Sequence, residues 1–301
     1  MLRGIDISGH QHGAINGYKP CDFVFLKATQ ELWEDVTFAG TGTWDGERYF
    51  LLRSALLSGA VVGAFHYLIA RNDHPSATPA LQAANFVNAI RRANGNLDGI
   101  LCAVMVEHSQ LYRSLPNAKH VREFIEEFQQ LAPNQHLFIY TNTAYWQSHV
   151  KMDLRNFKHV HLWLAWWTDT SGEIGTMRTM LPSDAWSRRI GGLIPTIIQF
   201  TSQARVGDVR VRGNLYDGDI RSLQRLALPA LPEPIATLAF KDRFRSPVAR
   251  VPIAPNPKTK TKLVTGSVVL GIVAIVIAAA LVALSLGKER WAGIFEENDD
   301  R

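Results

Sequence analysis

The sequence predicts an α/β fold in which short buried strands alternate with amphipathic helices. Several apolar runs continue without a polar interruption, which is typical of strands covered on both faces of a parallel sheet. Segments with apolar residues at helical spacing lie between these runs, and the alternation extends over roughly two hundred residues. An α/β barrel and a doubly wound sheet both fit this order. No GxGxxG or P-loop follows the first strand, which weakens the nucleotide-binding alternatives.

The expected elements follow one another in a regular order along the chain. The expected strands are residues 1–10, 23–29, 61–67, 99–107, 136–141, 161–167 and 195–201. A first helix is expected over 79–94, where Pro79 stands early, at a position that a helix tolerates. A second helix is expected over 117–131, because Val121, Phe124, Ile125 and Phe128 fall on one face.

Two carboxylates stand at or near the ends of these expected strands. The run that begins at Gly99 stops on Glu107, and Asp6 lies in the first strand before a Ser-Gly turn. In barrels of alternating strands and helices, the carboxyl ends of the strands form the active-site face. A buried carboxylate is also costly unless it is paired or used. A surface glutamate and a structural aspartate are the alternatives, but the two acids together favour a catalytic site.

Aromatic and amide side chains gather at the other strand ends. The chain has eight tryptophans, and the expected substrate-binding residues are Tyr67, Tyr140, Trp163, Trp166 and Gln199. Aromatic rings stack on the apolar faces of sugars, while amides and carboxylates hydrogen-bond hydroxyl groups. The set therefore favours a carbohydrate site over a hydride or phosphate site. The alternative is that these aromatic residues fill the core.

Eight segments in order resemble the glycoside hydrolase family 25 muramidases, the Chalaropsis-type lysozymes common among bacteriophage endolysins. The family patterns Gly-Ile-Asp-Val-Ser, Phe-Val-Ile-Lys-Ala-Thr and Gly-x-Tyr-His-Phe are matched by Gly4–Ser8, Phe23–Thr29 and Gly63-Ala-Phe-His-Tyr67. Further matches are Gln82–Phe86, Ile139–Thr141, Leu162–Ala165 and Ile198–Ser202, and the closing Val-Asp-x-Asn is approximated by Tyr216–Asp219.

The resemblance covers about residues 1–225 and carries expectations for both fold and chemistry. It implies an irregular TIM-like (β/α) barrel that cleaves the β-1,4 bond between N-acetylmuramic acid and N-acetylglucosamine in bacterial peptidoglycan. Glu107 matches the family's general acid/base, and Asp6 and Asp217 are the expected further catalytic acids. A raised pKa is expected for Glu107 at its apolar strand end. No cofactor or metal ion is expected.

The departure from the family lies in its signature Asp-x-Glu, where this chain has Met105-Val106-Glu107. Alternate strand residues face the same way, so the family's two carboxylates would act together. Losing one positioned charge is expected to cost on the order of 10²–10⁴ in rate. The alternative to a weakened muramidase is a glycan-binding or virion-associated structural module. Restoring aspartate at Met105 is expected to raise the rate. Gln30-Glu31, where the family often has Glu-Gly, is a smaller departure.

Composition narrows the possible partners. The formal net charge is +5, but seven Lys or Arg residues against one Asp lie between 241 and 262, so the rest of the chain is close to neutral. The charge is therefore local and gives no evidence for nucleic-acid binding. Cys21 and Cys102 are the two cysteines, too few to suggest a disulfide framework.

The C-terminal part predicts a membrane anchor. The lysozyme-like domain is expected to end at 228, and the basic segment 229–262 holds seven prolines, typical of an extended linker. Residues 263–287 contain no charged side chain and are long enough to span a bilayer. A short acidic tail, 288–301, follows.

The flanking charges predict the orientation of this span. Its N-terminal flank is basic, which places the barrel on the cytoplasmic side, and no signal peptide is expected before the first strand. Peptidoglycan lies outside the cell. A phage lysin held at the inner membrane until lysis, or one carried in a virion, would reconcile the two expectations.

Overall fold

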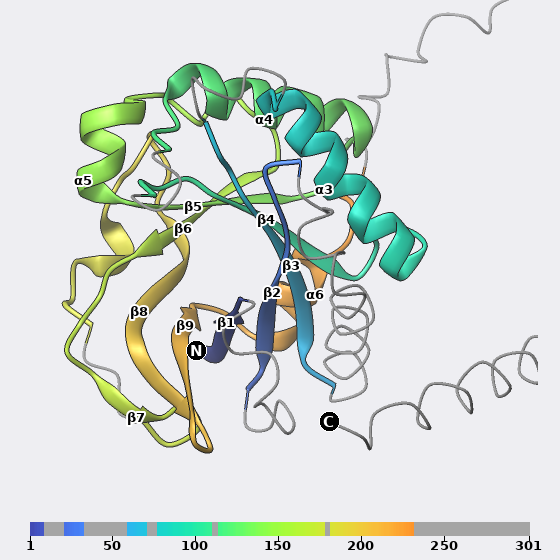
Figure 1. Cartoon of the computed structure of the whole chain (residues 1–301). Coiled ribbons are helices and arrows are strands. Elements are labelled where there is room, and N and C mark those ends of the chain that lie inside the picture. Colours follow the sequence, from blue (N-terminus) through green and yellow to red (C-terminus); the bar gives the residue numbers. More distant parts are fainter. Residues whose placement is uncertain (9–20, 33–58, 71–76, 110–113, 178–180, 232–301) are drawn as a thin grey trace, which may run out of the picture. The chain divides into compact units, whose positions relative to one another are not determined.

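The computed structural model of the chain describes residues 1–8, 21–32, 59–70, 77–109, 114–177 and 181–231. These residues belong to one compact unit, Met1–Leu238, built around a nine-stranded sheet (Figure 1). The strands are β1 (Leu2–Ile7), β2 (Phe23–Gln30), β3 (Val61–Tyr67), β4 (Ile100–Met105), β5 (Leu137–Asn142), β6 (Val160–Ala165), β7 (Ser171–Glu173), β8 (Pro195–Val206) and β9 (Val209–Tyr216).

The sheet closes on itself into a barrel. The strands follow the order β6-β5-β4-β3-β2-β1-β9-β8, and a pairing between β6 and β8 completes a ring of eight. Seven of these strands are parallel, whereas β9 runs antiparallel to its neighbours β1 and β8. The short strand β7 pairs with the far part of β8, outside the ring. The barrel prediction is thus confirmed, and the doubly wound sheet is wrong.

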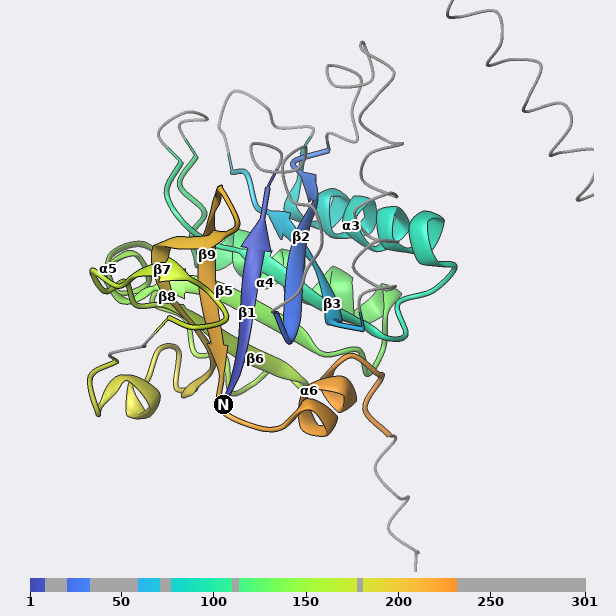
Figure 2. The same cartoon turned by 90° about the horizontal axis from the view of Figure 1, so that it is seen from below.

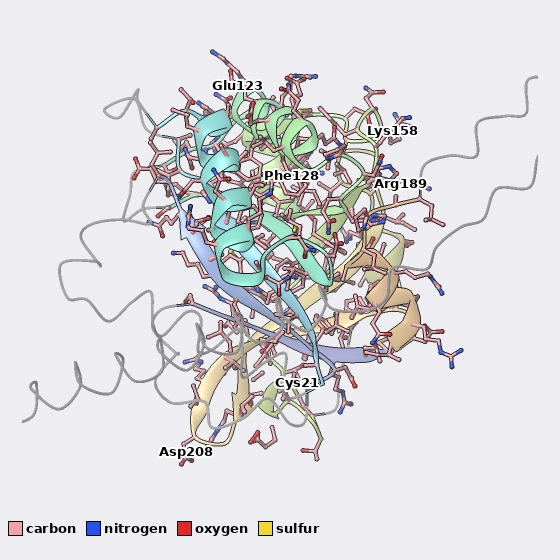
Figure 3. The ribbon with its side chains drawn as sticks, turned by 90° about the vertical axis from the view of Figure 1, so that its right-hand side faces the viewer. Cys21, Glu123, Phe128, Lys158, Arg189 and Asp208 are labelled. Carbon is pink, nitrogen blue, oxygen red and sulfur yellow. The ribbon has the colours of Figure 1, made fainter. Side chains whose placement is uncertain are left out.

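The two predicted helices are present, with bounds close to those expected. They are α3 (Pro79–Asn94) and α4 (Ala118–Leu131), which lie side by side against the outside of the barrel (Figure 1). The Thr78 side chain caps α3 by accepting a hydrogen bond from the Leu81 amide, and Asn117 caps α4 in the same way. Phe128 of α4 is fully buried against the strands (Figure 3).

Several smaller elements were not predicted. A short helix, α5 (Thr143–Tyr145), runs into a π-helical turn after β5, and a 3-10 turn lies at Ala185–Ser187. β8 continues past its predicted end and returns as β9 through a two-residue turn, with Asp208 at the tip of the hairpin (Figure 3). The last described helix, α6 (Ile220–Leu226), lies at the end of the barrel that carries the N-terminus (Figure 2).

Alternation along the strands separates two apolar cores. One fills the barrel and includes Phe25, Phe65, Met105, Tyr140 and Trp163. The other lies between the barrel and its helices and includes Ile5, Val104, Phe86 and Phe124. The parity of a residue within its strand therefore decides whether its side chain faces the barrel interior or the helices.

Glycines on both sides of β2 make room for two phenyl rings inside the barrel. Gly4 of β1 is paired with Phe23, and Gly63 of β3 is paired with Phe25. A Cβ atom at either glycine would collide with the ring of its partner. The space beside β2 at this level is therefore filled by the rings of β2 and not by its two neighbouring strands.

The predicted anchor lies outside the residues that the structure describes, which end at 231. This applies to most of the linker 229–262, to the predicted span 263–287 and to the tail 288–301. In the described part of the chain, no helix is both long enough and apolar enough to cross a membrane.

Candidate active site

Asp6 lies at the centre of a polar network at the carboxyl ends of the seven parallel strands, an end that we call the mouth. The side chain is almost completely buried on the inward face of β1. Its Oδ1 accepts hydrogen bonds from Gln199 Nε2 and Asn214 Nδ2, each at 2.8 Å. Its Oδ2 lies 3.5 Å from Nη1 of Arg212, on the antiparallel strand β9. Three strands therefore converge on one carboxylate.

Three further donors fix the orientation of the two amides. The hydroxyl of Tyr140 donates to Gln199 Oε1 at 3.0 Å, and the Trp167 indole donates to the same oxygen at 2.7 Å. The Trp163 indole donates to Asn214 Oδ1 at 2.9 Å. Because both amide oxygens are occupied by N–H or O–H donors, both amide nitrogens must point at Asp6.

The network around Asp6 offsets only part of the effect of burial on the pKa of its carboxyl. Burial raises the pKa of the Asp6 carboxyl, while Arg212, Asn214 and Gln199 act in the opposite direction. About a third of the Arg212 side chain remains exposed, so the guanidinium reaches from the buried carboxylate to the surface of the mouth. Asp6 and Arg212 thus form a fixed ion pair whose cation is accessible.

Glu107 stands two residues beyond the end of β4, on the same side of the chain as Met105. Its side chain is partly exposed, and it is hydrogen-bonded to the hydroxyl of Tyr67 at the end of β3. Burial raises the pKa of Glu107, opposed by Arg212, Tyr67 and Lys27 and supported by Asp6. The raised pKa agrees with the sequence prediction. A carboxyl that keeps its proton closer to neutral pH is suited to general acid catalysis.

Met105 offers no second carboxylate on this strand. It is 1% exposed and belongs to the inner core, with Phe65, Tyr140 and Trp163. Its thioether can contribute packing but neither charge nor a strong hydrogen-bond acceptor. The carboxylate that accompanies Glu107 in the mouth is therefore Asp6, from the far side of β2 and β3.

The structure corrects three of the predicted substrate-binding residues. Tyr140, Trp163 and Gln199 have at most 1% of their surface exposed, so they cannot contact a sugar in this arrangement. They orient the network around Asp6 instead. They were predicted at strand ends, but all three lie inside their strands, in β5, β6 and β8, and the sequence did not show how deep in the barrel they lie.

Two further predicted site residues, Trp166 and Asp217, lie away from the mouth. Trp166 lies outside the barrel, packed on the outer core with the Arg188 guanidinium 4.2 Å from its ring centre. Asp217 follows β9, whose antiparallel course puts Tyr216 beside Leu2, at the opposite end from Glu107. The structure therefore brings together Asp6, Glu107 and Tyr67, but not Trp166 or Asp217.

Two residues of the mouth were missed by the sequence prediction, and a third, Trp167, was placed at a strand end but not chosen as a substrate contact. Arg212 and Asn214 lie on the unpredicted strand β9, and Trp167 is 58% exposed at the end of β6. Strand alternation was the signal for Trp167, because it shares the inward side with Trp163, whereas Trp166 does not. No comparable signal pointed to Arg212, since arginines that alternate with valines, as Arg210 and Arg212 do, are typical of a solvated strand face.

A buried histidine ties the mouth to the helix layer. His66 accepts a hydrogen bond at Nδ1 from Thr29 Oγ1 (2.8 Å) and donates from Nε2 to Gln82 Oε1 (3.0 Å). Gln82 in turn bonds both backbone groups of Ile69, so its oxygen must be the acceptor from His66. Burial lowers the pKa of His66 to about 3. The neutral imidazole thus bridges β2, β3 and α3 directly behind Tyr67.

The loop after β2 departs from the family pattern in sequence but has a backbone conformation that suits the family's glycine. Glu31 has φ +52°, the left-handed region that glycine adopts most easily, and glycine is the residue the family often has there. Gln30 is hydrogen-bonded to Lys27 at the mouth. Among the described residues, no group of three His, Cys, Asp or Glu side chains is arranged to hold a metal ion.

The sequence and the fold were both compared with those of known proteins. The model of the family "Glycosyl hydrolases family 25" matches residues 5–208. A comparison with curated proteins finds no match. The fold is similar to a lysozyme from Streptomyces coelicolor, with 21% identity, TM-score 0.53, and coverage of 75% of this chain and 96% of that one.

Two fungal structures are similar to the same extent. A muramidase from Trichobolus zukalii has 18% identity and TM-score 0.52, with 75% of this chain and 99% of that chain covered. A family 25 lysozyme from Aspergillus fumigatus has 18% identity and TM-score 0.50, with the same coverages. At these identities the structures show the fold, and the family model shows the membership. The chain therefore belongs to glycosyl hydrolase family 25 and is a glycoside hydrolase.

Proposed function

We propose that the protein is an N-acetylmuramidase that hydrolyses the β-1,4 bond between N-acetylmuramic acid and N-acetylglucosamine in bacterial peptidoglycan. The observation that supports this most directly is the partly exposed Glu107 carboxyl with its raised pKa, in the same mouth as the ion-paired Asp6. An acid that holds its proton beside a fixed negative charge is what glycosidic cleavage requires.

In the proposed reaction, Glu107 gives its proton to the glycosidic oxygen as the bond from that oxygen to the anomeric carbon breaks. The departing sugar leaves with a new hydroxyl group. Water then adds to the anomeric carbon, and its proton returns to Glu107. Asp6 lies buried behind Arg212, so it offsets that cation and acts on the positive charge of the ring through its field and not by contact. The missing carboxylate at Met105 makes the reaction slower than in a site with two adjacent acids.

The test is the product formed from purified peptidoglycan by the full-length chain in detergent. We expect new N-acetylmuramic acid reducing ends, identified by mass spectrometry after borohydride reduction. Glu107→Gln should lower the activity by a factor of at least about 10² while keeping the fold. Asp217→Asn is the matched control, because it also removes one carboxylate charge but lies at the other end of the barrel. Reducing ends of N-acetylglucosamine, or an active Glu107→Gln variant, would contradict the proposal.

Met105 alone favours a second function, that of a glycan-binding module without catalytic activity. A barrel without the second acid on β4 could bind glycan and act as a virion-associated structural module. This alternative predicts binding to insoluble peptidoglycan with no new reducing ends, and an unchanged affinity in Glu107→Gln. Release of reducing ends by the wild type but not by this variant excludes it.

We propose further that residues 263–287 anchor the protein in a lipid bilayer, as expected of a phage lysin. The support is the uncharged apolar run itself, with Lys258, Lys260 and Lys262 before it. The basic flank favours a barrel on the cytoplasmic side before lysis, or in a virion. Full-length protein should stay in the membrane pellet after alkaline carbonate extraction, and a chain that ends at 262 should not. Full-length protein in the supernatant would overturn the anchor.

A further inference from the structure

Arg212 brings a cation into the mouth from the antiparallel strand β9. In the register of β1 and β9 it lies directly opposite Asp6, so the two side chains share the inward face of the barrel. Nη1 of Arg212 is 3.5 Å from Oδ2 of Asp6, which makes an ion pair but is long for a hydrogen bond. The Asp6 side chain is 1% exposed, whereas that of Arg212 is 35% exposed. The positive end of the pair therefore faces the mouth.

The ion pair leaves the Arg212 guanidinium able to bind a ligand. Oδ2 of Asp6 has no hydrogen-bond partner among the described residues, so its contact with Arg212 is electrostatic. An arginine side chain has five N–H donors in a planar fork, which suits two parallel hydrogen bonds to a carboxylate. Asp6 thus holds the guanidinium in place without using the donors on its exposed side.

A second arginine extends this cationic face outward. Arg210 and Arg212 are two positions apart on β9, so their side chains point to the same side of the strand. Arg210 is exposed, and its Nε donates to the Ser202 carbonyl at 3.0 Å. The hairpin of β8 and β9, which has Asp208 at its tip (Figure 3), therefore carries two arginines in sequence from the mouth outward.

The acids that act most strongly on the Arg212 charge do not block it from a ligand. They are Asp6 and Glu107. Asp6 is buried, so an anion that enters the mouth lies nearer to the guanidinium than to this carboxylate, and Coulomb attraction falls with distance. Glu107 holds its proton when it acts as the proposed acid, and it then carries no charge. The mouth therefore favours an anionic ligand over a neutral one.

An exposed aromatic ring belongs to the same polar network. The Trp167 side chain is 58% exposed, and its indole donates to Gln199 at 2.7 Å. Gln199 donates to Asp6 at 2.8 Å, and Asp6 is the partner of Arg212. Aromatic rings stack on sugars, and guanidinium groups pair with carboxylates. The mouth thus offers the two contacts that a sugar with a carboxylate would use.

We propose that Arg212, extended outward by Arg210, binds a carboxylate of the glycan and makes the protein selective for anionic glycan chains. The inference rests on the proposed function, which makes the glycan of peptidoglycan the ligand. Muramic acid has a lactyl carboxylate where its stem peptide has been removed, and stem peptides have carboxylates of their own. The guanidinium recognises the group that both sources share. Because Asp6 already orients the side chain, little ordering is needed on binding.

The first test compares ligands on one protein. Full-length Glu107→Gln in detergent is used, since its neutral amide stands for the protonated acid and prevents cleavage. Glycan chains stripped of stem peptides by an amidase are compared with the same chains after their carboxylates have been converted to carboxamides. The charged chains should bind about tenfold more tightly, measured by tryptophan fluorescence. This preference should fall about threefold between about 50 and 300 mM salt.

Peptide-bearing chains, before and after the same conversion, identify the source of the carboxylate. A loss of affinity on converting the stripped chains identifies the lactyl carboxylate. A loss confined to peptide-bearing chains identifies the stem peptide, and both results support the proposal. Equal affinities before and after conversion in both kinds of chain overturn it.

The second test changes the arginine. Arg212→Gln should remove the preference for charged chains, and Arg212→Lys should keep part of it, because an ammonium retains the charge but not the planar fork. Arg210→Gln should weaken the preference about twofold. Arg205→Gln is the matched control and should leave it unchanged, because it removes a charge from the same hairpin but Arg205 is paired with Asp208 at 4.0 Å.

Thermal unfolding shows which variants fold. A full preference in folded Arg212→Gln overturns the proposal, and so does an equal loss in Arg205→Gln. If Arg212→Gln does not fold because Asp6 has lost its partner, Arg212→Lys decides, and a full preference in that variant overturns the proposal.

This inference and the proposed function fail separately. If charged chains bind through Arg212 but the wild type releases no reducing ends, the muramidase proposal fails and the carboxylate site stands. If the wild type releases reducing ends equally fast from charged and converted chains of both kinds, and binds them equally well, the muramidase stands and the carboxylate site fails.

Discussion

The two ends of the barrel carry similar acids with different surroundings. At the mouth, Asp6 is buried and held by Gln199, Asn214 and Arg212. At the other end, Asp217 is exposed, and Asp219 caps α6 by accepting a hydrogen bond from the Ser222 amide at 2.7 Å. The first acid depends on tertiary contacts from two strands, β8 and β9, whereas the second serves one turn of a local helix.

Strand polarity decides which end an acid occupies. Asp6 and Glu107 lie on or follow parallel strands, so they meet at the carboxyl ends. Asp217 also follows an apolar strand, but β9 is antiparallel and places it at the end of the barrel opposite the mouth, which we call the closed end. Leu223 and Ala227 complete the inner core there. A carboxylate after a strand therefore predicts an active site only when the direction of that strand is known.

The largest expected effect separates the two aspartates. Asp6→Asn should lower turnover by about 10²–10³-fold, because the fixed negative charge of the mouth is lost. It should also destabilise the fold by about 1–3 kcal/mol, since Arg212 loses its partner in a half-buried position. Steady-state kinetics and urea unfolding measure the two effects.

The corresponding Asp217→Asn variant should match the wild type within about twofold in turnover. Equal losses in both variants would mean that Asp217 reaches the site, contrary to the strand register. A fully active Asp6→Asn would show that the network around Asp6 only supports the fold.

Two adjacent tryptophans give a smaller contrast on opposite sides of β6. Trp167→Ala should raise KM about tenfold, equivalent to about 1.4 kcal/mol, because an exposed ring at the mouth is lost. Trp166→Ala should leave KM unchanged and lower the melting temperature, since Trp166 packs between Arg188 and the outer core. Binding of soluble glycan fragments, followed by tryptophan fluorescence, measures the first effect. The contrast fails if Trp166→Ala alters KM more than Trp167→Ala does.

Two histidines at the closed end should make the free energy of unfolding depend on pH. His136 Nδ1 and His161 Nε2 are hydrogen-bonded at 2.8 Å, and burial, together with the neighbouring His159, lowers both pKa values to about 4. Since the unfolded histidines titrate near 6.5, this contribution is complete above that pH and is lost as pH falls from about 6.5 toward 4.

Replacing both histidines with glutamine should therefore flatten the loss of unfolding free energy between pH 7 and 4.5. The expected difference is about 1 kcal/mol for the pair, a value reduced because His136 is only half-buried. Urea unfolding at the two pH values measures it. Parallel pH profiles of wild type and variant would show that the pair does not resist protonation.

The parallel strands and the two long helices were predictable, because burial on both faces leaves an uninterrupted apolar run. Val61–Tyr67 and Pro79–Asn94 have the bounds expected from sequence. Glu107 and Asp6 were predicted for the same reason, since a carboxylate in or after such a run is conspicuous, and their catalytic roles stay a prediction. The inner and outer faces also follow from alternation, which places Met105 and Glu107 on one side.

The rest of the site depends on contacts that no local pattern encodes. β9 reads as a solvated strand because Arg210 and Arg212 alternate with valines, yet Arg212 turns inward to a carboxylate more than two hundred positions away. The depth of Tyr140 and Trp163 likewise depends on closure of the ring between β6 and β8. Closure and the reversal of the last strand are tertiary events, and they decided which predicted residues meet.

The glycines beside β2 link sequence variation at the site to residues that never meet a substrate. Gly4 stands two positions before Asp6, and Gly63 four positions before Tyr67, each on the inward side of its strand. Because Phe23 and Phe25 occupy the space above them, any larger residue at Gly4 or Gly63 would push its strand away from β2. Among relatives, position 4 should therefore covary with position 23, and position 63 with position 25. Two phenyl rings inside the barrel thus restrict which residues the strands that carry Asp6 and Tyr67 can have at these positions.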